Sequence, residues 1–221
     1  ICVPELKEMC FMQKINEATK KCNIIVSGID YDEVSKAKKI LDDAGIVDSD
    51  GDGYREFDGD GKNIELSFLT YDSRCLKEFS EGTAANIEKI GIKVNVQETD
   101  ADTEWNKLTA GEYDLLSTNW LTVQVGDPIG YMENWYSKSK ANYCSYKNEK
   151  YDKLYEKLLV ETDQDKIKEL VQEMQQILVD DGAALIHGYY KGNICSTKAV
   201  EGANVYTADY YWISTAIKPA E

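Results

Sequence analysis

The sequence predicts an α/β fold in which a mixed β-sheet is flanked by helices. Apolar and polar residues alternate over 92–96, which is the pattern of a strand with one buried face. A helix is predicted before that strand, with Leu76, Phe79, Thr83, Ile87 and Ile90 at helical spacing. A second, shorter helix is predicted after it. Gly91 and Gly111 supply the left-handed conformation that closes each helix. Strands that alternate with helices are typical of this fold class.

Residues 84–128 contain the centre of this prediction, a β-α-β unit. Asp102 is placed to cap a short helix that runs through Leu108. The apolar run over 113–120 predicts a second, buried strand. Ligands of such sheets meet the loops that follow the carboxyl ends of the strands. We therefore expect the loop over 119–128 to form part of a binding site.

Two further elements precede this unit. A helix that is capped by Asp30 and ends at Gly45 has an apolar face made of Val34, Ala37, Ile40, Leu41 and Ala44. Residues 64–68 then alternate as a strand that leads into Tyr71. The helix after Tyr71 crosses over to the next strand, so the two strands are expected to run parallel. Tyr71 is thus expected at the same sheet edge as Trp120.

The carboxyl-terminal part is predicted to be mainly helical. A short helix over 129–136 and a loop over 137–146 precede two long helices. Apolar residues line these two helices over 151–158 and 167–178, with Asp163 as a cap and Gly182 as the stop. Residues 183–190 and 193–196 are predicted to be closing strands. Residues 1–29 give mixed signals and are treated as a separate amino-terminal segment.

The composition excludes several classes of partner. The net charge of −15 repels nucleic acid backbones and anionic lipid headgroups, so no nucleic acid partner is expected. No apolar run approaches the ~20 residues of a membrane helix. The six cysteines are consistent either with extracellular disulfides or with buried thiols. Cys75 and Cys195 are expected to pack in apolar surroundings.

An acidic loop follows the first predicted helix and has the spacing of a calcium loop. Its candidate ligands are Asp48, Asp50, Asp52, the main-chain carbonyl of Tyr54, and Asp58. Position twelve of the loop is Gly59, where an EF-hand has a bidentate glutamate. The alternative is an acidic surface turn in which Asp and Gly serve the backbone conformation. Calcium is the only cofactor that the sequence suggests.

Catalytic motifs are missing from the sequence. His187 is the single histidine, and neither a GxSxG nor an HExxH motif surrounds it. Phosphate-binding loops of the GxxxxGK[ST] or GxGxxG type are also missing. We therefore predict a binding protein and not an enzyme.

Several segments resemble one family in their order and spacing. EKIGIKVNV, GEYDLLSTNW, GDP and NEKYDKLYEKLLVETDQDKIKELVQEMQQIL resemble the family 5 extracellular solute-binding proteins of ABC importers, which bind oligopeptides, dipeptides or nickel. The resemblance covers roughly residues 30–202. It implies that residues 30–221 are one lobe of a two-lobed, type II periplasmic-binding-protein-like fold, with the second lobe absent from this chain. Residues 1–29 depart from the family pattern.

The resemblance also implies a ligand site. In the family, the tryptophan of this motif and the backbone that follows it line the solute cleft. The corresponding candidates here are Asn119, Trp120, Leu121, Thr122, Val123 and Gln124, joined by Tyr71 at the neighbouring strand end. Val123 stands where peptide-binding members have an aspartate that pairs with the amino terminus of the ligand. Asp127, in the GDP motif, is expected to cap the turn that follows it.

The resemblance implies a function in transport. The lobe would clamp a peptide-like or other small solute against the second lobe of the full-length protein and present it to the permease subunits of an ABC importer. The expected location is extracellular, at the cell surface or periplasmic, in some members as a lipoprotein. On its own, this lobe is expected to bind solute weakly. Two alternatives remain open: a ligand-sensing receptor of the same fold, and a calcium-binding surface or adhesion module.

Overall fold

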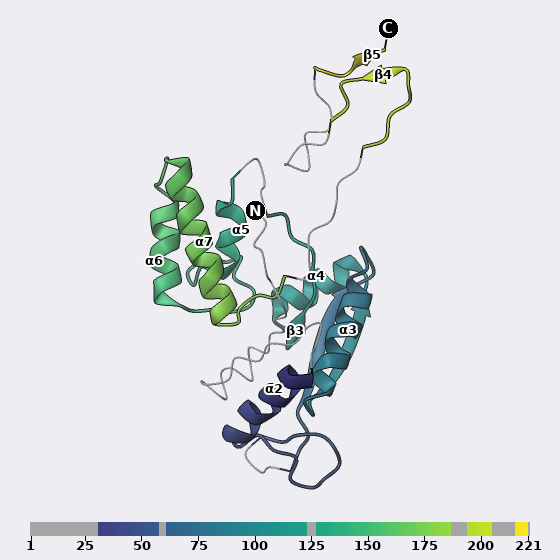
Figure 1. Cartoon of the computed structure of the whole chain (residues 1–221), viewed down its shortest axis with the longest axis vertical. Coiled ribbons are helices and arrows are strands. Elements are labelled where there is room, and N and C mark those ends of the chain that lie inside the picture. Colours follow the sequence, from purple (N-terminus) through teal and green to yellow (C-terminus); the bar gives the residue numbers. More distant parts are fainter. Residues whose placement is uncertain (1–30, 58–60, 123–126, 187–193, 205–214, 221) are drawn as a thin grey trace.

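A computed structural model describes residues 31–57, 61–122, 127–186, 194–204 and 215–220. It contains two groups of packed elements, one around a parallel sheet and one made of helices (Figure 1). A short antiparallel pair, β4 (Val200–Glu201) with β5 (Lys218–Pro219), follows them. Residues 1–29, Asp30 and His187 lie outside the described residues, so the predictions for them stay predictions.

The sheet is organised around β1 (Glu65–Tyr71). This strand lies between β2 (Lys93–Thr99) and β3 (Leu115–Leu116), and both pair with it in parallel. The strands predicted over 64–68 and 92–96 are thereby confirmed. The strand predicted over 113–120 is wrong in extent, because only two of its residues join the ladder. Beyond β3 the chain leaves the sheet, and the Thr70 hydroxyl donates to the carbonyl oxygen of Ser117 at 3.2 Å.

Helices cross over between these strands, as parallel pairing requires. Helix α3 (Leu76–Glu88) connects β1 to β2, and α4 (Ala101–Ala110) connects β2 to β3. The N-cap of α4 is Asp100, whose carboxylate accepts from the Thr103 N–H at 2.9 Å. The prediction of Asp102 as the cap is wrong, because the extended residue before the helix lies two positions earlier.

Helix α3 buries one face, which includes a polar residue. Phe79 is 40% exposed, whereas Ser80 is fully buried. Burial of this polar side chain is possible because its hydroxyl donates to the carbonyl oxygen of Leu76 at 2.8 Å. Of the residues at helical spacing that predicted this helix, Leu76, Thr83, Ile87 and Ile90 are buried and Phe79 is not.

Helix α2 (Tyr31–Asp43) packs on the same core through Ala37 and Leu41. Ala44, predicted on that face, is exposed beyond the helix end. Ile46 fills the core instead, because Gly45 adopts a positive φ of 81° and turns the chain back. This first core therefore joins α2, α3 and the sheet.

A second core is built mainly from helices, with Tyr146 from the loop before α6. It joins α5 (Ile129–Met132), the 3-10 turn η1 (Glu133–Trp135), α6 (Glu149–Leu158) and α7 (Gln164–Asp180). Asp163 caps α7 as predicted, with its carboxylate accepting from two main-chain N–H groups. Tyr151 is fully buried and donates to the Met132 carbonyl oxygen at 2.7 Å, which joins α6 to α5.

Two predictions for the rest of the chain are wrong. The described parts of the predicted closing strands, 183–186 and 194–196, contain no strand. Cys75 and Cys195 are exposed and not packed in apolar surroundings. Cys75 precedes α3 with a positive φ of 59°, so its position serves the turn between strand and helix.

Arg55 ties the amino-terminal elements together from a buried position. Its Nε donates to the Ile90 carbonyl oxygen at 2.7 Å, and its Nη1 contacts Asp42 and the Ile46 carbonyl oxygen at 2.6 Å and 2.5 Å. Gly91, whose carbonyl oxygen accepts from the Arg55 N–H, has a positive φ of 83° and lies against this side chain. The guanidinium therefore joins the ends of α2 and α3.

Glu104 is a buried carboxylate on α4. Only 5% of the residue is exposed, its Oε1 has no hydrogen-bond partner among the described residues, and Thr118 hydrogen-bonds the carboxylate. Burial raises the pKa of Glu104 above its ordinary value, and the Thr118 contact offsets this only in part. The ionised form of this side chain is thus disfavoured by folding.

We expect Arg55→Lys to lower the free energy of unfolding by about 1–3 kcal/mol. A lysine ammonium group cannot reach all three acceptors that the planar guanidinium group contacts. Chemical denaturation measures this. Arg74→Lys, at an exposed position, is the matched control and should change stability by less than about 0.5 kcal/mol. Equal stabilities of Arg55→Lys and the unchanged protein would contradict this role of Arg55.

We expect the stability of the protein relative to Glu104→Gln to depend on pH. Folding raises the pKa of Glu104. The contribution of this side chain to the free energy of unfolding is therefore complete below pH 4.5, its ordinary pKa, and is lost as the pH rises through the pKa of the folded state. Denaturant titrations of both proteins from about pH 4 to about pH 8 measure this. Parallel pH profiles would show that the group titrates alike in the folded and unfolded chains.

Candidate functional site

A pocket of about 250 Å³ lies between the sheet and the helical group. One wall comes from β3 and the chain on either side of it, residues 113–118 and Trp120. The facing wall comes from residues 131–135, the loop at 141–144, and residues 183–185. The pocket thus joins segments from both cores, at the side of the sheet where the chain leaves β3.

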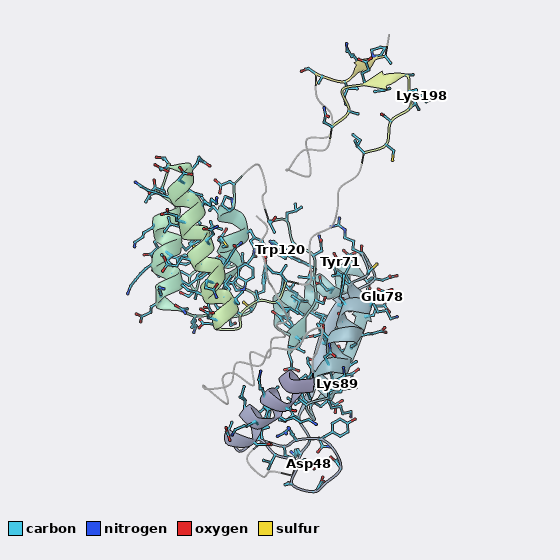
Figure 2. The ribbon with its side chains drawn as sticks, in the orientation of Figure 1. Asp48, Tyr71, Glu78, Lys89, Trp120 and Lys198 are labelled. Atoms are coloured by element: carbon cyan, nitrogen blue, oxygen red, sulfur yellow. The ribbon has the colours of Figure 1, made fainter. Side chains whose placement is uncertain are left out.

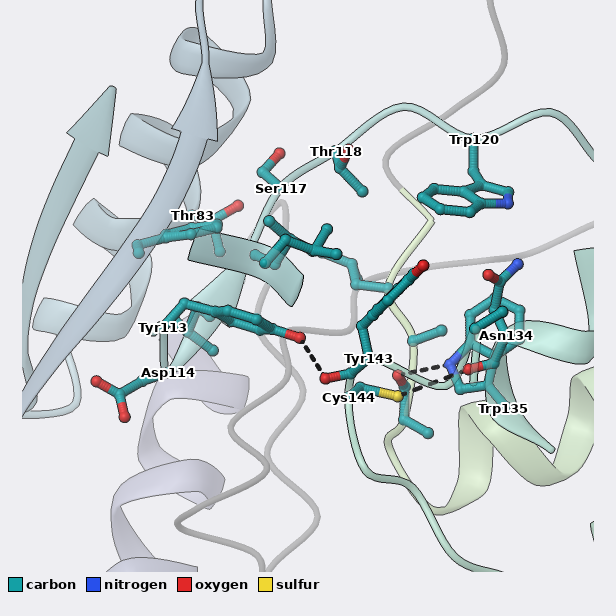
Figure 3. Close-up of a pocket in the computed structure, with 18 of the residues that line it drawn as sticks. Thr83, Tyr113, Asp114, Ser117, Thr118, Trp120, Asn134, Trp135, Tyr143 and Cys144 are labelled. Atoms are coloured by element: carbon teal, nitrogen blue, oxygen red, sulfur yellow. Dashed lines mark hydrogen bonds between the residues drawn. The ribbon is translucent and has the colours of Figure 1, made fainter. Parts of the chain in front are cut away.

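Aromatic side chains form much of the pocket surface. Figure 3 shows Trp120, Tyr143 and Asn134 facing the same space, with Tyr113 on the sheet side. Trp120 is 37% exposed, so its indole ring remains available for stacking. The Tyr113 hydroxyl donates to the Tyr143 carbonyl oxygen at 2.9 Å and thereby ties the two walls together. Burial raises the pKa of Tyr113 to about 12.

Trp135 lies on the helical side and is held from two directions. Its indole Nε1 donates to the Ala183 carbonyl oxygen at 3.3 Å, and its ring meets that of Tyr131 edge to face at 5.1 Å. These contacts join η1 to the segment after α7. The aromatic wall is therefore fixed before any solute enters.

A few neutral polar groups accompany the aromatic surface. Ser117 Oγ is buried and has no hydrogen-bond partner among the described residues. The Asn134 amide group donates to the Tyr131 carbonyl oxygen at 2.8 Å, which orients this side chain in the pocket wall. Apolar walls with a few oriented polar groups are typical of small-molecule sites.

The ionisable groups of the lining do not form a catalytic pair. Burial raises the pKa of the Cys144 thiol, which keeps it protonated, and no histidine or lysine is among the described lining residues. The Asp114 carboxylate accepts from the N–H and the hydroxyl of Ser67, at 2.9 Å and 2.7 Å. This geometry suits binding by stacking and hydrogen bonding.

The structure places the predicted ligand residues unevenly. Trp120 lines the pocket, whereas Asn119, Leu121 and Thr122 are half-buried outside its lining. Tyr71 ends β1 as predicted and is also outside the lining. Val123 and Gln124 lie outside the described residues, so their role stays a prediction. Asp127 accepts from the Ile129 N–H at 2.7 Å, which agrees with its predicted capping role.

The sequence analysis missed most of the facing wall and, on the sheet side, Tyr113. Tyr113, Asn134, Trp135 and Tyr143 come from segments that were interpreted as strand, short helix and loop. The density of aromatic residues over 131–146 was the available signal. Loop geometry decides which of them face the pocket, and the sequence pattern does not specify it.

The predicted calcium loop lies well away from the pocket (Figure 2). Asp48 and Asp50 lie close together there, and Glu56 joins them, with one carboxylate oxygen of each within 4.8 Å of the others. Asp52 is engaged otherwise, because its two oxygens accept from the Tyr54 N–H at 2.8 Å and from Asn63 Nδ2 at 2.7 Å. Asp58 lies outside the described residues.

Every helix in the described ranges is too short or too polar to cross a lipid bilayer.

The comparisons with known proteins agree on one family. The profile of the bacterial extracellular solute-binding proteins, family 5 Middle, matches residues 13–143. The chain is 30% identical over 147 residues to the probable D,D-dipeptide-binding periplasmic protein DdpA of Escherichia coli K12, covering 64% of this chain and 28% of that protein. It is 24% identical over 205 residues to the oligopeptide-binding protein AppA of Bacillus subtilis 168, covering 87% of this chain and 36% of that protein.

A solved structure gives the same result. A mannohexaose-bound periplasmic oligopeptide-binding protein of an oligopeptide ABC transporter from Thermotoga maritima superposes with a TM-score of 0.58 at 26% identity. The superposition covers 75% of this chain and 31% of that one. The chain thus spans about a third of the length of these relatives, and its fold is that of type II periplasmic binding proteins. The chain belongs to the family 5 bacterial extracellular solute-binding proteins, which are binding proteins of transport systems and not enzymes.

Proposed function

We propose that this chain is the lobe of a two-lobed solute-binding protein that supplies one wall of the solute cleft, and that the whole protein delivers its solute to an ABC importer outside the cytoplasm. The observation that supports this most directly is the pocket beside Trp120, which is aromatic, partly open and free of a catalytic pair among its described residues. The relatives, which are named for binding dipeptides and oligopeptides, support a transport role.

Peptide-like solutes are the class that we propose. Aromatic rings stack on side chains and on peptide planes, and hydroxyl and amide groups such as those of Ser117 and Asn134 match the donors and acceptors of a peptide backbone. The Asp114 carboxylate is engaged by Ser67. Recognition on this wall therefore depends on neutral contacts, which fits the presence of Val123 where an aspartate would pair with an amino terminus.

Native mass spectrometry of the protein purified from its natural host tests this proposal. We expect a small peptide-like molecule to be bound, released on denaturation and recovered intact, because the site binds without reacting. Trp120→Ala should lower the fraction of protein that carries it by roughly tenfold. Phe79→Ala is the matched control, since Phe79 has a similar exposed fraction on α3 and lies outside the pocket. A chemically altered molecule, or equal occupancy in Trp120→Ala, would contradict the proposal.

Ser117→Ala should have opposite effects on stability and binding. Without solute, it removes a buried hydroxyl that lacks a partner among the described residues, so the free energy of unfolding should stay equal or rise by up to about 1 kcal/mol. If that hydroxyl bonds the solute, occupancy by the co-purified molecule should fall by roughly two- to tenfold. Denaturation of the solute-free protein and native mass spectrometry measure the two effects. A loss of stability without a loss of occupancy would assign Ser117 a purely structural role.

A further inference from the structure

We propose that Asp48, Asp50 and Glu56 form a calcium site in the loop between α2 and β1. One carboxylate oxygen of each lies within 4.8 Å of the others, close enough for a single cation to contact all three. Calcium binds hard oxygen ligands in flexible geometries and accepts waters in its remaining positions. The site is separate from the solute pocket and does not depend on the proposed function.

Glu56 provides the observation that points to a cation. The residue is only 2% exposed, and its Oε2 accepts from the Ser49 N–H at 2.9 Å. Its Oε1 is buried and has no hydrogen-bond partner among the described residues. A buried carboxylate requires a partner of opposite charge or a full set of hydrogen bonds. Two further carboxylates stand beside it, so the environment as described adds repulsion.

Arg55, the neighbouring cation in sequence, does not fill this role. Its guanidinium donates to the Ile90 and Ile46 carbonyl oxygens and to Asp42, on the side of the core. Adjacent residues of an extended segment point to opposite sides. The charge of Glu56 is therefore not balanced from within this segment, and an external cation between the three carboxylates would balance it.

The loop holds these carboxylates near one another through its own backbone. Asp48 accepts from the Gly51 and Gly53 N–H groups at 2.7 Å and 2.9 Å, and Asp50 accepts from the Asp52 N–H at 3.0 Å. The main chain of Glu56 is fixed by its N–H bond to the Val47 carbonyl oxygen at 3.0 Å. A preformed set of ligands lowers the ordering cost of binding.

This ligand set differs from the one that loop spacing predicts. Asp52 is replaced by Glu56, because the Asp52 carboxylate is engaged by Asn63 and by the Tyr54 N–H. Glu56 occupies the ninth position of the loop when Asp48 is counted as the first. A cation here would join the chain just after α2 to the chain just before β1.

Calorimetry and thermal unfolding of the full 221-residue chain test the proposal, with calcium chloride and magnesium chloride compared at constant ionic strength. We expect a calcium Kd of about 10⁻⁴–10⁻³ M, the range of extracellular modules. Calcium at roughly ten times the Kd should raise Tm by about 3–5 °C, and magnesium should raise it less.

Glu56→Gln keeps the shape of the side chain and should weaken calcium binding at least tenfold and abolish the calcium-dependent Tm shift. Its metal-free Tm should equal or exceed that of the unchanged protein, an outcome that a merely structural role of the carboxylate would not give. Asp50→Asn, at an exposed position, should likewise weaken binding. Glu88→Gln, an exposed acid on α3, is the matched control and should leave both measurements unchanged. Absence of a calcium-dependent Tm shift in the unchanged protein, or an undiminished shift in Glu56→Gln, would overturn the proposal.

Discussion

The parallel pairing of β1 with strands on both sides is the constraint on which the rest of this structure depends. Parallel neighbours cannot be joined by tight turns, so helices must return the chain from one end of the sheet to the other. Helices α3 and α4 serve this purpose and cover β1, whose residues from Leu66 to Thr70 are buried or half-buried. All three strands then end at the same edge, and the chain that leaves β3 there carries Trp120.

The pocket results from this constraint together with the second, helical core. The sheet provides a wall that ends in Ser117 and Thr118, and the helical group provides Asn134, Trp135 and Tyr143. The hydrogen bond from the Tyr113 hydroxyl to the Tyr143 carbonyl oxygen joins the two walls. The pocket therefore depends on how the helical group packs against the sheet.

Periodicity was sufficient to predict the regular elements. Alternation predicted β1 and β2, and apolar stripes with Asp163 as a cap predicted α6 and α7. The extent of β3 was overestimated, because an apolar pattern does not show how many of its residues pair with the neighbouring strand. The burial of Ser80 was also not predictable from an apolar pattern, because its hydroxyl is satisfied by the Leu76 carbonyl oxygen of its own helix.

The residues of the pocket were predictable only where they belong to a recognisable sequence motif. Trp120 was found through its family resemblance, whereas Asn134 and Tyr143 depend on how a non-periodic loop folds against the sheet. Glu56 was missed as a candidate calcium ligand because the spacing of a calcium loop assigns ligands by their position in the sequence. That spacing does not show that a charged residue is buried.

The two cores also occupy successive stretches of the chain. The residues of the first core end at Leu115, and those of the second begin at Ile129 with the neighbours of Met132. Among the described residues, the two cores share no side chain. The pocket shares residues with both stretches, including Phe68 and Trp135. The pocket is therefore complete only when both stretches are folded.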